Sequence, residues 1–323
     1  MPPARRKRGE FETIAALFRP LTQGRREALN LADDVAALRA PPGRDLIVTA
    51  DQLIAGTHTL GDEPADLVAK KALRRNLSDL AAKGAAPYGY FMTLALPRGT
   101  RDSWLARFAA GLADDGARYR IPLLGGDTGS TDGPLVVSIT ALGLGPRGRR
   151  IARAGAKAGM DVYVTGTIGD AALGLDALQG RGRRDRTLER RYFLPEPRVA
   201  FARVLARYAR AAIDVSDGLL ADLGHLARAS GVAARIEPAD VPLSAAARRA
   251  LAAGAAFERV LTGGDDYEVL FAAARADSRA LHAAAARSGL RISCIGTLVA
   301  GAPGRIDISG MSAARISRGF THF

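Results

Sequence analysis

Aspartates are the residues of this sequence whose type and spacing could do chemistry. They occur in six short motifs beside predicted strand ends or turns, LADDVA, VTADQL, NLSDLAAKGA, LLGGDTG, AIDVSDGL and LTGGDDYE, which carry Asp33, Asp34, Asp51, Asp79, Asp127, Asp214, Asp217, Asp265 and Asp266. Any one of them could cap a turn or a helix, because a carboxylate accepts local backbone N–H bonds. If the strand ends converge, however, four or more carboxylates would face one cleft, and their repulsion would require divalent cations between them.

Mg²⁺ is the cation that such a cleft predicts, because hard oxygen ligands without clustered His or Cys favour it over zinc or copper. Substrate phosphates usually complete the shell of Mg²⁺ held by a few carboxylates, so the expected ligand is a nucleotide. Gly125 and Gly126 follow an apolar strand in LLGGDTG, where backbone N–H groups could approach a phosphate. The sequence has no P-loop, no dinucleotide-binding glycine motif and no protein-kinase signature set.

Histidine and cysteine offer little alternative chemistry. His58 follows Asp51 on a loop that could reach the same cleft, whereas His225 lies in a helical pattern and is expected to be a packed or surface residue. The single cysteine, Cys294, lies in the apolar strand RISCIGT and is expected to be a core residue rather than a nucleophile. The sequence therefore predicts a nucleotide site that relies on aspartates and metal ions, with no Ser/His/Asp or Cys/His arrangement for nucleophilic catalysis.

The elements that must position these motifs alternate between apolar runs of strand length and segments of helical period, which predicts an α/β protein. Strands are predicted at 46–50, 88–96, 121–124, 135–144, 161–165, 267–272 and 291–297, and helices at 64–83, 101–119, 197–210, 218–230, 243–253 and 278–288. A segment rich in Gly and Arg, residues 145–159, indicates a domain boundary near residue 150. The expected division is a disordered basic tail (1–9), an N-terminal domain (10–148) and a C-terminal α/β domain (149–323).

Composition excludes several classes of protein. The chain has 323 residues, 48% of them hydrophobic, and its longest uncharged windows have 14 residues, fewer than a membrane-spanning helix needs. One cysteine cannot form an internal disulfide, and the basic N-terminus does not lead into a long apolar run as a secretory signal would. These features predict a cytoplasmic protein without a membrane partner.

The net charge of +13 raises the question of nucleic-acid binding. Residues 5–8, 147–157 and 181–191 carry essentially all of the surplus, and we interpret them as a tail, a linker and an exposed insert. Few aromatic residues are interleaved with these charges to stack on bases. A solvated basic surface is therefore expected, and nucleic acid is not an expected partner.

The ordered set LADDVA, TADQLIAGTH, NLSDLAAKGA, LLGGDT, IDVSDGLLADLGH and LTGGDDYE resembles the thiamine-monophosphate kinases. That family belongs to the superfamily of aminoimidazole ribonucleotide synthetase, selenophosphate synthetase and hydrogenase maturation factor E. The resemblance runs from about Glu10 to Phe323 and is weakest at 180–192. It implies ATP-dependent phosphorylation of thiamine monophosphate to thiamine diphosphate. It also implies an α/β fold of the α+β type in a homodimer, with an N-terminal mixed sheet that pairs across the dimer and a C-terminal α/β sandwich.

The resemblance also implies roles for individual residues. It places the nucleotide in a cleft of the N-terminal domain, with several Mg²⁺ ions between the phosphates and the aspartates. The implied metal site comprises Asp34, Thr49, Ala50, Asp51, Asp79, Asp127, Asp214 and Asp217; the implied nucleotide site comprises Gly126, Asp127, Arg153 and Ser216; the implied substrate site comprises His58, Asp265 and Ser317.

Three positions depart from the family pattern. Ala50 stands where the family has a second hydroxyl, so a backbone carbonyl or a water must replace that ligand. Asp265 stands where the family has Glu, which shortens the acidic arm by one methylene. Ser317 stands where the family places an aromatic residue on the substrate ring, a position that Phe320 could fill instead.

The implied reaction is direct in-line transfer of the γ-phosphoryl group without a phosphoenzyme, because an anionic phosphate monoester needs no strong base to become a nucleophile. Two alternatives stay open: a sister ATP-using enzyme resembling the ribonucleotide amide cyclases, and a basic nucleic-acid-binding protein. A selenophosphate synthetase is not supported, because its reactive residue would precede Cys294, where this chain has no cysteine.

Overall fold

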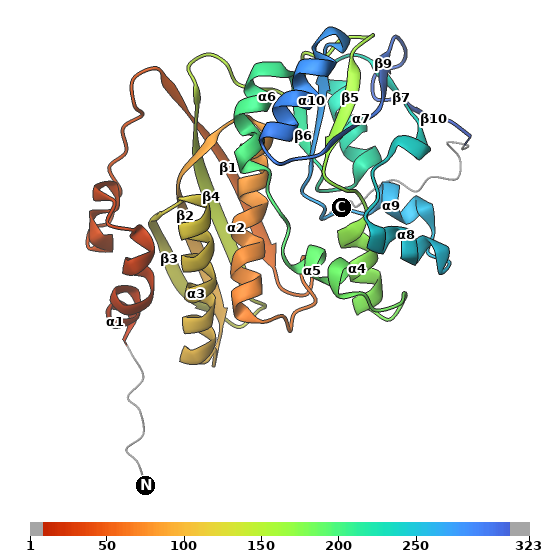
Figure 1. Ribbon diagram of the computed structural model, residues 1–323. Helices are drawn as coiled ribbons and strands as arrows, with labels where there is room; N and C mark the ends of the chain where they lie inside the picture. The colour runs from red at the N-terminus through yellow and green to blue at the C-terminus, as the bar shows by residue number, and fades with distance from the viewer. Residues whose placement is uncertain (1–8, 311–323) are drawn as a thin grey trace. The chain divides into compact units, whose positions relative to one another are not determined.

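The computed structural model describes residues 9–310 (Figure 1). They form two compact units: one comprises the described residues up to Asn76 together with Pro87–Leu144, and the other comprises Leu77–Ala86 together with the described residues from Gly145 onwards. The sequence did not indicate that a segment of the first half contributes to the second unit. The boundary expected at 148/149 stays a prediction. Within residues 9–310, no helix has the length and apolar character needed to cross a membrane.

The first unit is built on a four-stranded sheet with the order β1-β4-β2-β3. Strands β2 and β3 are parallel neighbours, and β1 and β3 form the two edges. Helices α2 and α3 lie side by side along the sheet (Figure 1). The elements are α1 (Glu10–Thr13), η1 (Ile14–Phe18), η2 (Arg19–Thr22), η3 (Arg26–Leu31), β1 (Arg44–Ile54), α2 (Ala65–Ala82), β2 (Ala86–Pro97), α3 (Asp102–Tyr119), β3 (Leu123–Thr131) and β4 (Val136–Pro146).

Helices α2 and α3 pack closely because one of them carries a glycine at the contact. The buried face of α3 includes Leu105, Phe108 and Leu112, at the spacing of an amphipathic helix. A Cβ at Gly111 of α3 would lie 2.5 Å from the carbonyl oxygen of Asp66 on α2, so only glycine allows this separation.

A buried ion pair also joins these two helices. The guanidinium of Arg74 donates from Nε to Asp115 Oδ2 (2.6 Å) and from Nη2 to Oδ1 (2.8 Å). Only 6% and 2% of the two side chains are exposed, so each charge depends on the other for solvation. One turn away on α2, Lys70 makes a 2.8 Å ion pair with Asp114, whose side chain is 69% exposed.

The second unit is built on a six-stranded sheet with the order β10-β7-β9-β5-β8-β6. Its β10–β7 pair is parallel, and its other pairs are antiparallel. The elements are β5 (Asp161–Thr165), α4 (Asp170–Leu178), α5 (Arg186–Phe193), η4 (Val199–Phe201), α6 (Ala202–Tyr208), β6 (Ala209–Asp214), α7 (Leu219–Ala229), β7 (Ala233–Ile236), η5 (Pro238–Asp240), α8 (Ala245–Ala252), α9 (Phe257–Thr262), β8 (Val269–Ala273), η6 (Arg275–Asp277), α10 (Ser278–Arg287), β9 (Ile292–Val299) and β10 (Ile306–Ile308).

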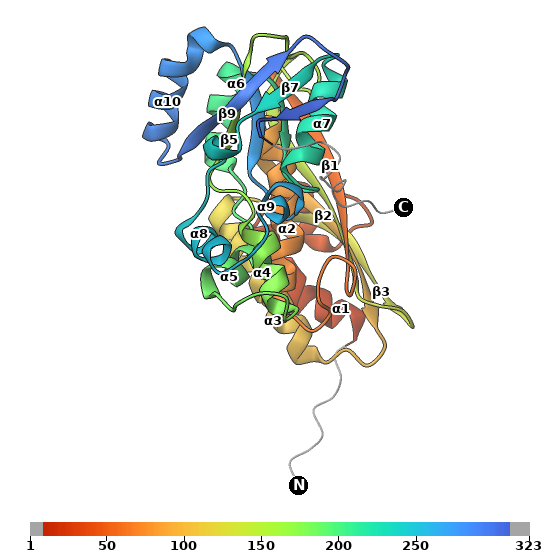
Figure 2. The ribbon, with the colours of Figure 1, turned by 90° about the vertical axis from the view of Figure 1, so that its right-hand side faces the viewer.

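Both faces of this sheet are buried. Along β5, Val162 and Val164 enter a core shared with α4, α7 and α8, whereas Tyr163 enters a second core shared with α6 and α10. Helices α7 and α10 accordingly flank β9 on opposite sides (Figure 2). The expected C-terminal α/β sandwich is confirmed, and both sheets are mixed.

Three local expectations were wrong. The helix expected over 197–210 ends at Tyr208, and the chain continues directly into β6. The segment 181–191 is not simply an exposed insert, because α5 begins within it and Leu188 is buried. Cys294 is exposed rather than part of the core: its neighbours Ile292 and Ile295 enter different cores on the two faces of β9, and the cysteine between them stays at the surface.

The N-terminus of α4 is capped from a distant part of the chain. The cap residue, Gly169, has no side chain to satisfy the first N–H groups. Asp266 does so instead, since its carboxylate accepts hydrogen bonds from the backbone N–H of Gly169 (2.6 Å) and Ala171 (3.2 Å). Only 1% of Asp266 is exposed, and this burial raises the pKa of its carboxyl to about 8.

Replacing Asp115 with Ala should lower the free energy of unfolding by about 3–5 kcal/mol, because it leaves the Arg74 charge buried without its partner. Replacing Asp114 with Ala, in the exposed pair, should cost less than about 1 kcal/mol. Urea denaturation of the two variants measures the difference. Equal effects would contradict the assignment of Arg74–Asp115 as the structural pair.

The raised pKa of Asp266 predicts a pH dependence of stability. Between about pH 4 and pH 8 the folded state holds a proton on Asp266 that the unfolded state has lost, so stability falls with rising pH by up to about 1.4 kcal/mol per unit. Above pH 8 both states are ionised and the loss is complete. Asp266→Asn should lack this contribution. Urea denaturation from pH 5 to 9 should therefore show that the free energy of unfolding of the wild type declines relative to that of the variant. If the two free energies change in parallel with pH, the raised pKa of Asp266 is contradicted.

Candidate functional site

Strand β1 carries three of the residues expected to bind metal: Thr49, Ala50 and Asp51. Asp51 Oδ2 lies 3.8 Å from Nε of Arg75 on α2, and a third of the Asp51 side chain is exposed. Thr49 is half-buried and Ala50 is exposed. Alternation along this edge strand places Asp51 on the same, more buried face as Thr49 and Leu53, and its carboxylate remains partly exposed near the Arg75 guanidinium.

Strand β3 carries Gly126 and Asp127, the expected nucleotide motif. A Cβ on Gly126 would lie 1.8 Å from the carbonyl oxygen of Met92 on β2, so this position requires glycine. Asp127 is exposed, and its Oδ1 accepts a hydrogen bond from the backbone N–H of Thr128 (2.8 Å). The exposed glycine backbone and the adjacent carboxylate form an accessible polar edge.

The two acidic strands do not meet within the first unit. Strands β1 and β3 are the opposite edges of the sheet, and three inter-strand spacings of about 4.8 Å separate them by roughly 14 Å. Asp34 is exposed on the segment after η3. The expected convergence of these aspartates at one sheet end is therefore not produced by this unit alone.

The loop after β1 holds His58. Its Nδ1 accepts a hydrogen bond from the backbone N–H of Ile54 (3.0 Å), so the proton of the neutral ring is on Nε2. In this tautomer Nε2 carries the N–H donor of the ring. The half-buried imidazole is thus oriented by the turn that follows the strand.

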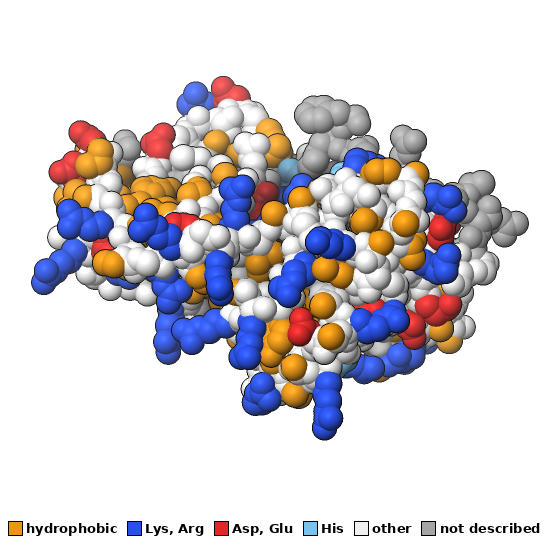
Figure 3. All heavy atoms as spheres, turned by 90° about the horizontal axis from the view of Figure 1, so that it is seen from above, with side chains coloured by type: hydrophobic (Ala, Val, Ile, Leu, Met, Phe, Trp, Pro, Cys, Tyr) orange, Lys and Arg blue, Asp and Glu red, His pale blue; other side chains and the backbone are white. Residues whose placement is uncertain are grey.

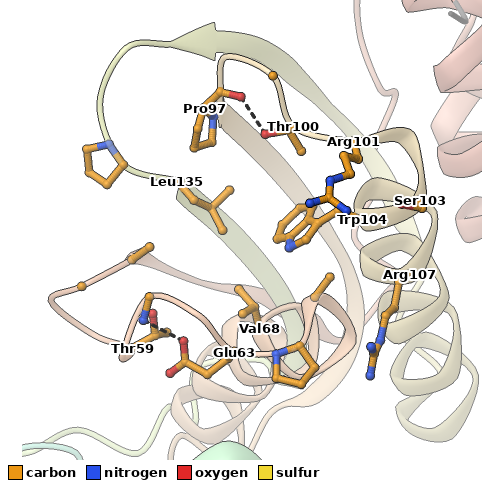
Figure 4. Close-up of a pocket in the computed structure, with 17 residues that line it drawn as sticks. Thr59, Glu63, Val68, Pro97, Thr100, Arg101, Ser103, Trp104, Arg107 and Leu135 are labelled. Carbon is orange, nitrogen blue, oxygen red and sulfur yellow. Dashed lines mark hydrogen bonds between the residues drawn. The ribbon is translucent and has the colours of Figure 1, made fainter.

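A cavity of about 900 Å³ lies in the same unit (Figure 4). The loop after β1, the first turns of α2 and α3, and the loop between β3 and β4 surround it, with Trp104, Arg101 and Arg107 contributed by the start of α3. None of the residues that the sequence marked for the site lines this cavity. Its distinctive residue is Trp104, the single tryptophan of the chain.

In the second unit, the last turns of α2 meet β6. Ser78 Oγ donates a hydrogen bond to Asp214 Oδ2 (2.8 Å), and Lys83 Nζ donates to the carbonyl oxygen of Ala212 (2.6 Å). Burial lowers the pKa of Lys83, with a further contribution from the charge of Arg153, while the charges of Asp214 and Asp79 oppose the shift. The expected metal residues Asp79 and Asp214 are thus neighbours of a buried cation.

The loop between β6 and α7 is held by Asp222. Its Oδ2 accepts hydrogen bonds from the backbone N–H groups of Ser216 (3.0 Å), Asp217 (3.0 Å) and Gly218 (3.2 Å). Burial, together with the charges of Asp214 and Asp217, raises the pKa of Asp222 well above the usual aspartate value. Asp217 itself is half-buried. One motif therefore contains both Asp222, which holds the loop, and Asp217, the candidate ligand.

The loop before β8 lies directly against this one. The backbone N–H of Asp265 donates to the carbonyl oxygen of Ser216 (2.9 Å), and that of Tyr267 donates to Val215 (2.8 Å). A Cβ on Gly264 would lie 2.2 Å from the Ser216 carbonyl oxygen, so the glycine permits the contact. The structure therefore brings the IDVSDG and GGDDYE motifs together.

Sequence reasoning missed several residues that hold these loops: Ser78, Lys83, Asp222, Arg191 and Glu268. Four of them lie inside or beside the quoted motifs, so proximity in sequence was the available signal. Arg191, on α5, carries no such signal. Arg153 is exposed, and Ser317 lies outside the described residues.

The donor set fits Mg²⁺ in chemistry, because it consists of carboxylate and hydroxyl oxygens. Across residues 9–310, no group of three or more His, Cys, Asp or Glu side chains is arranged to hold a metal ion. The candidate ligands are instead divided: Asp34, Thr49, Asp51 and Asp127 belong to the first unit, and Asp79, Asp214 and Asp217 to the second.

The chain matches known families over both of its halves. The family model described as AIR synthase related protein, N-terminal domain, matches residues 32–145, and the corresponding C-terminal domain model matches residues 157–309. Thiamine-monophosphate kinase of Caulobacter vibrioides is 48% identical over 299 residues, which cover 90% of this chain and 84% of the relative.

Two solved structures show the same fold over nearly the whole chain. Thiamine-monophosphate kinase from Stenotrophomonas maltophilia K279a has a TM-score of 0.85 at 38% identity, covering 93% of this chain and 97% of that one. AaThiL, complexed with AMPPCP and TMP, has a TM-score of 0.77 at 27% identity, covering 99% of this chain and all of that one. With both domain models matched and nearly half of its residues shared with a curated relative, this chain belongs to the thiamine-monophosphate kinase family of AIR synthase related proteins.

Proposed function

We propose that this protein transfers the γ-phosphoryl group of ATP to thiamine monophosphate, producing thiamine diphosphate and ADP. The observation that carries the proposal is the similarity, over 99% of the chain, to AaThiL complexed with TMP and AMPPCP, an ATP analogue. The sequence retains each of the aspartate motifs on which the family resemblance rests.

We propose that Mg²⁺ binds between the substrates and the oxygen ligands Asp34, Thr49, Ala50 (through its carbonyl or a water), Asp51, Asp79, Asp127, Asp214 and Asp217. When bound, the ions neutralise the charge of the phosphates and the charge that develops during transfer. The protein's part is to present these oxygens. Asp214 is held by a hydrogen bond from Ser78, and Asp51 lies 3.8 Å from the Arg75 guanidinium.

The remaining side chains bind and orient the two substrates. In this proposal the N-terminal domain (10–148) binds ATP through Gly126 and Asp127, and the C-terminal domain (149–323) contributes Arg153 and Ser216. His58 and Asp265 contact the acceptor. The loop contacts of Ser216 and Asp265 support a shared role, since one backbone hydrogen bond joins these residues.

The proposed chemistry is a single in-line displacement. A terminal oxygen of the thiamine monophosphate phosphate forms a bond to the γ-phosphorus, and the bond from that phosphorus to the β–γ bridging oxygen breaks as ADP leaves. The attacking phosphate is already anionic, so no side chain has to remove a proton. Positioning by the residues above supplies the protein's contribution.

Three departures from the family pattern affect the details of this proposal. Ala50 removes one hydroxyl ligand, and its exposure leaves room for a water. At Asp265 the shorter arm is fixed by Tyr267, whose hydroxyl donates to Asp265 Oδ1 (3.0 Å). Ser317, beyond the described residues, takes the place of an aromatic contact with the substrate ring.

A homodimer that joins β1 of one copy to β3 of the other would complete the metal site. It would place Asp51 of one protomer near Asp127 of the partner subunit, which the separation within one sheet does not allow. Exposed edge strands favour such pairing, and Val48 on β1 is 59% exposed.

We further propose a cytoplasmic enzyme with small-molecule substrates rather than nucleic acid. The single cysteine cannot form an internal disulfide, which is typical of proteins from a reducing compartment. On the face shown in Figure 3, Lys and Arg side chains are spread among neutral and hydrophobic ones. This distribution favours a solvated basic surface over a continuous nucleic-acid groove.

The reaction is tested by incubating the protein with Mg²⁺ and ATP and offering thiamine monophosphate, thiamine or aminoimidazole ribonucleotide precursors in parallel. Thiamine diphosphate and ADP should form in equal amounts from the monophosphate alone. ADP formation with only a ribonucleotide precursor would move the activity to a sister enzyme of the superfamily.

The shared metal site predicts complementation between variants. Asp51→Asn and Asp127→Asn should each lower kcat by about 100-fold or more with the fold intact, whereas Asp132→Asn, an exposed aspartate just after β3, should have no effect. If two copies build each site, random mixing of the two inactive variants by unfolding and refolding should restore about a quarter of wild-type activity, because half of the dimers regain one intact site. Near-normal turnover of both single variants at saturating Mg²⁺ would overturn the metal site, and failure of mixing to restore activity would overturn its sharing.

A further inference from the structure

Glu268, the last residue of the GGDDYE motif, is completely buried and receives donors from three parts of the chain. Thr165 Oγ1 on β5 donates to Oε2 (2.7 Å), and Arg198 donates to both carboxylate oxygens, with Nε 2.6 Å from Oε2. Arg191 Nη2, from helix α5, donates to Oε1 (2.8 Å). The carboxylate is therefore the centre of a charge-assisted network in which two guanidiniums face one buried anion.

The network fills its space completely. A Cβ on Gly166, which follows Thr165, would lie 2.1 Å from Glu268 Oε1 and 2.6 Å from Arg198 Nη2. Gly166 also has a φ of +59°, a conformation that L side chains rarely adopt. The glycine after β5 is thus required by the position of the Glu268 carboxylate.

Backbone strain is concentrated in the loop immediately before Glu268. Asp265 (φ 72°) and Tyr267 (φ 51°) are both left-handed non-glycine residues, each at an expected cost of about 1–3 kcal/mol. Such residues persist where the surroundings hold them. The Tyr267 hydroxyl in turn fixes the carboxylate of Asp265, so the loop conformation sets where this acidic side chain points.

Arg191 contacts both this strained loop and the Glu268 carboxylate that follows it. The same Nη2 that donates to Glu268 also donates to the backbone carbonyl oxygen of Asp266 (3.4 Å), between the two left-handed residues. Its side chain is 13% exposed, in contrast to the exposed neighbour Arg190. Both guanidiniums of the network also lie near Glu196 Oε2, Arg191 Nη1 at 3.7 Å and Arg198 Nη1 at 3.5 Å. Arg191 is thus placed to act on the loop itself.

We propose that Arg191 is a positioning residue that holds the Asp265–Tyr267 loop in the conformation that binds the phosphorylated acceptor, an inference that rests on the proposed function. It acts through the Asp266 carbonyl and the Glu268 carboxylate and does not itself touch the substrate. The last residue of the basic segment 181–191 then has a role, because the Arg191 guanidinium stabilises the loop that carries Asp265.

The test compares Arg191→Gln, Arg191→Lys and the control Arg190→Gln in the full-length protein. Loss of the charge-assisted contacts should raise the KM for thiamine monophosphate about tenfold, with kcat and the KM for ATP within about twofold of wild type. Lysine keeps the charge but not the planar fork, so its KM should be intermediate. Arg190→Gln should match wild type.

Amide hydrogen exchange of residues 264–268 provides the readout that does not depend on turnover. It should be faster in Arg191→Gln and unchanged in Arg190→Gln, while exchange in the β5 and β8 strands stays at wild-type rates. The proposal would be overturned if Arg191→Gln kept the wild-type KM for thiamine monophosphate and the wild-type rate of loop exchange. A lower melting temperature with an unchanged KM would also overturn it. If wild type makes no thiamine diphosphate but loop exchange still responds to Arg191, the proposed function fails and the positioning of the loop stands.

Discussion

Among the buried carboxyl groups of the second unit, Asp214, Asp222, Asp266 and Glu268 can each stay out of water only because donors reach them. The donors differ in kind. Asp222 and Asp266 accept backbone N–H groups from a loop and from a helix N-terminus, whereas Glu268 is paired with guanidiniums. Because these donors come from segments far apart in the sequence, satisfying the buried carboxyl groups fixes how the α7, α4 and α5 segments meet the sheet.

The same constraint shapes the loops that carry the candidate ligands. Asp222 gathers three consecutive N–H groups of the SDG loop, and that loop in turn provides the carbonyl oxygen to which Asp265 donates. The glycines of both motifs are needed where backbones approach within van der Waals contact, as at Gly264. The buried Asp222 carboxyl group therefore determines the shape of one loop, and that loop determines the shape of the next.

How far the sequence could predict this arrangement depends on the range of the interactions. The periodicity of residues 101–119 was enough to predict α3, because helical contacts are local. The motifs predicted the acidic residues as one set, but they did not show that Asp266 caps α4, nearly a hundred residues earlier in the chain. Nor could α5 be predicted: its charged sequence resembles a solvated insert, and Arg191 has a role only because Glu268 lies buried beside it.

In two of the motifs, burial separates a pair of aspartates of identical chemistry into two roles. In GGDDYE, Asp266 is buried with both oxygens engaged by α4, while the half-buried Asp265 stands at the surface of the loop. In SDGLLAD, Asp222 is buried and Asp217 is half-buried. A carboxylate whose lone pairs already accept backbone N–H groups in an apolar setting has little left to offer a cation. The accessible member of each pair is therefore the one suited to bind a ligand, and the buried member fixes its loop, which is why a short motif contains both.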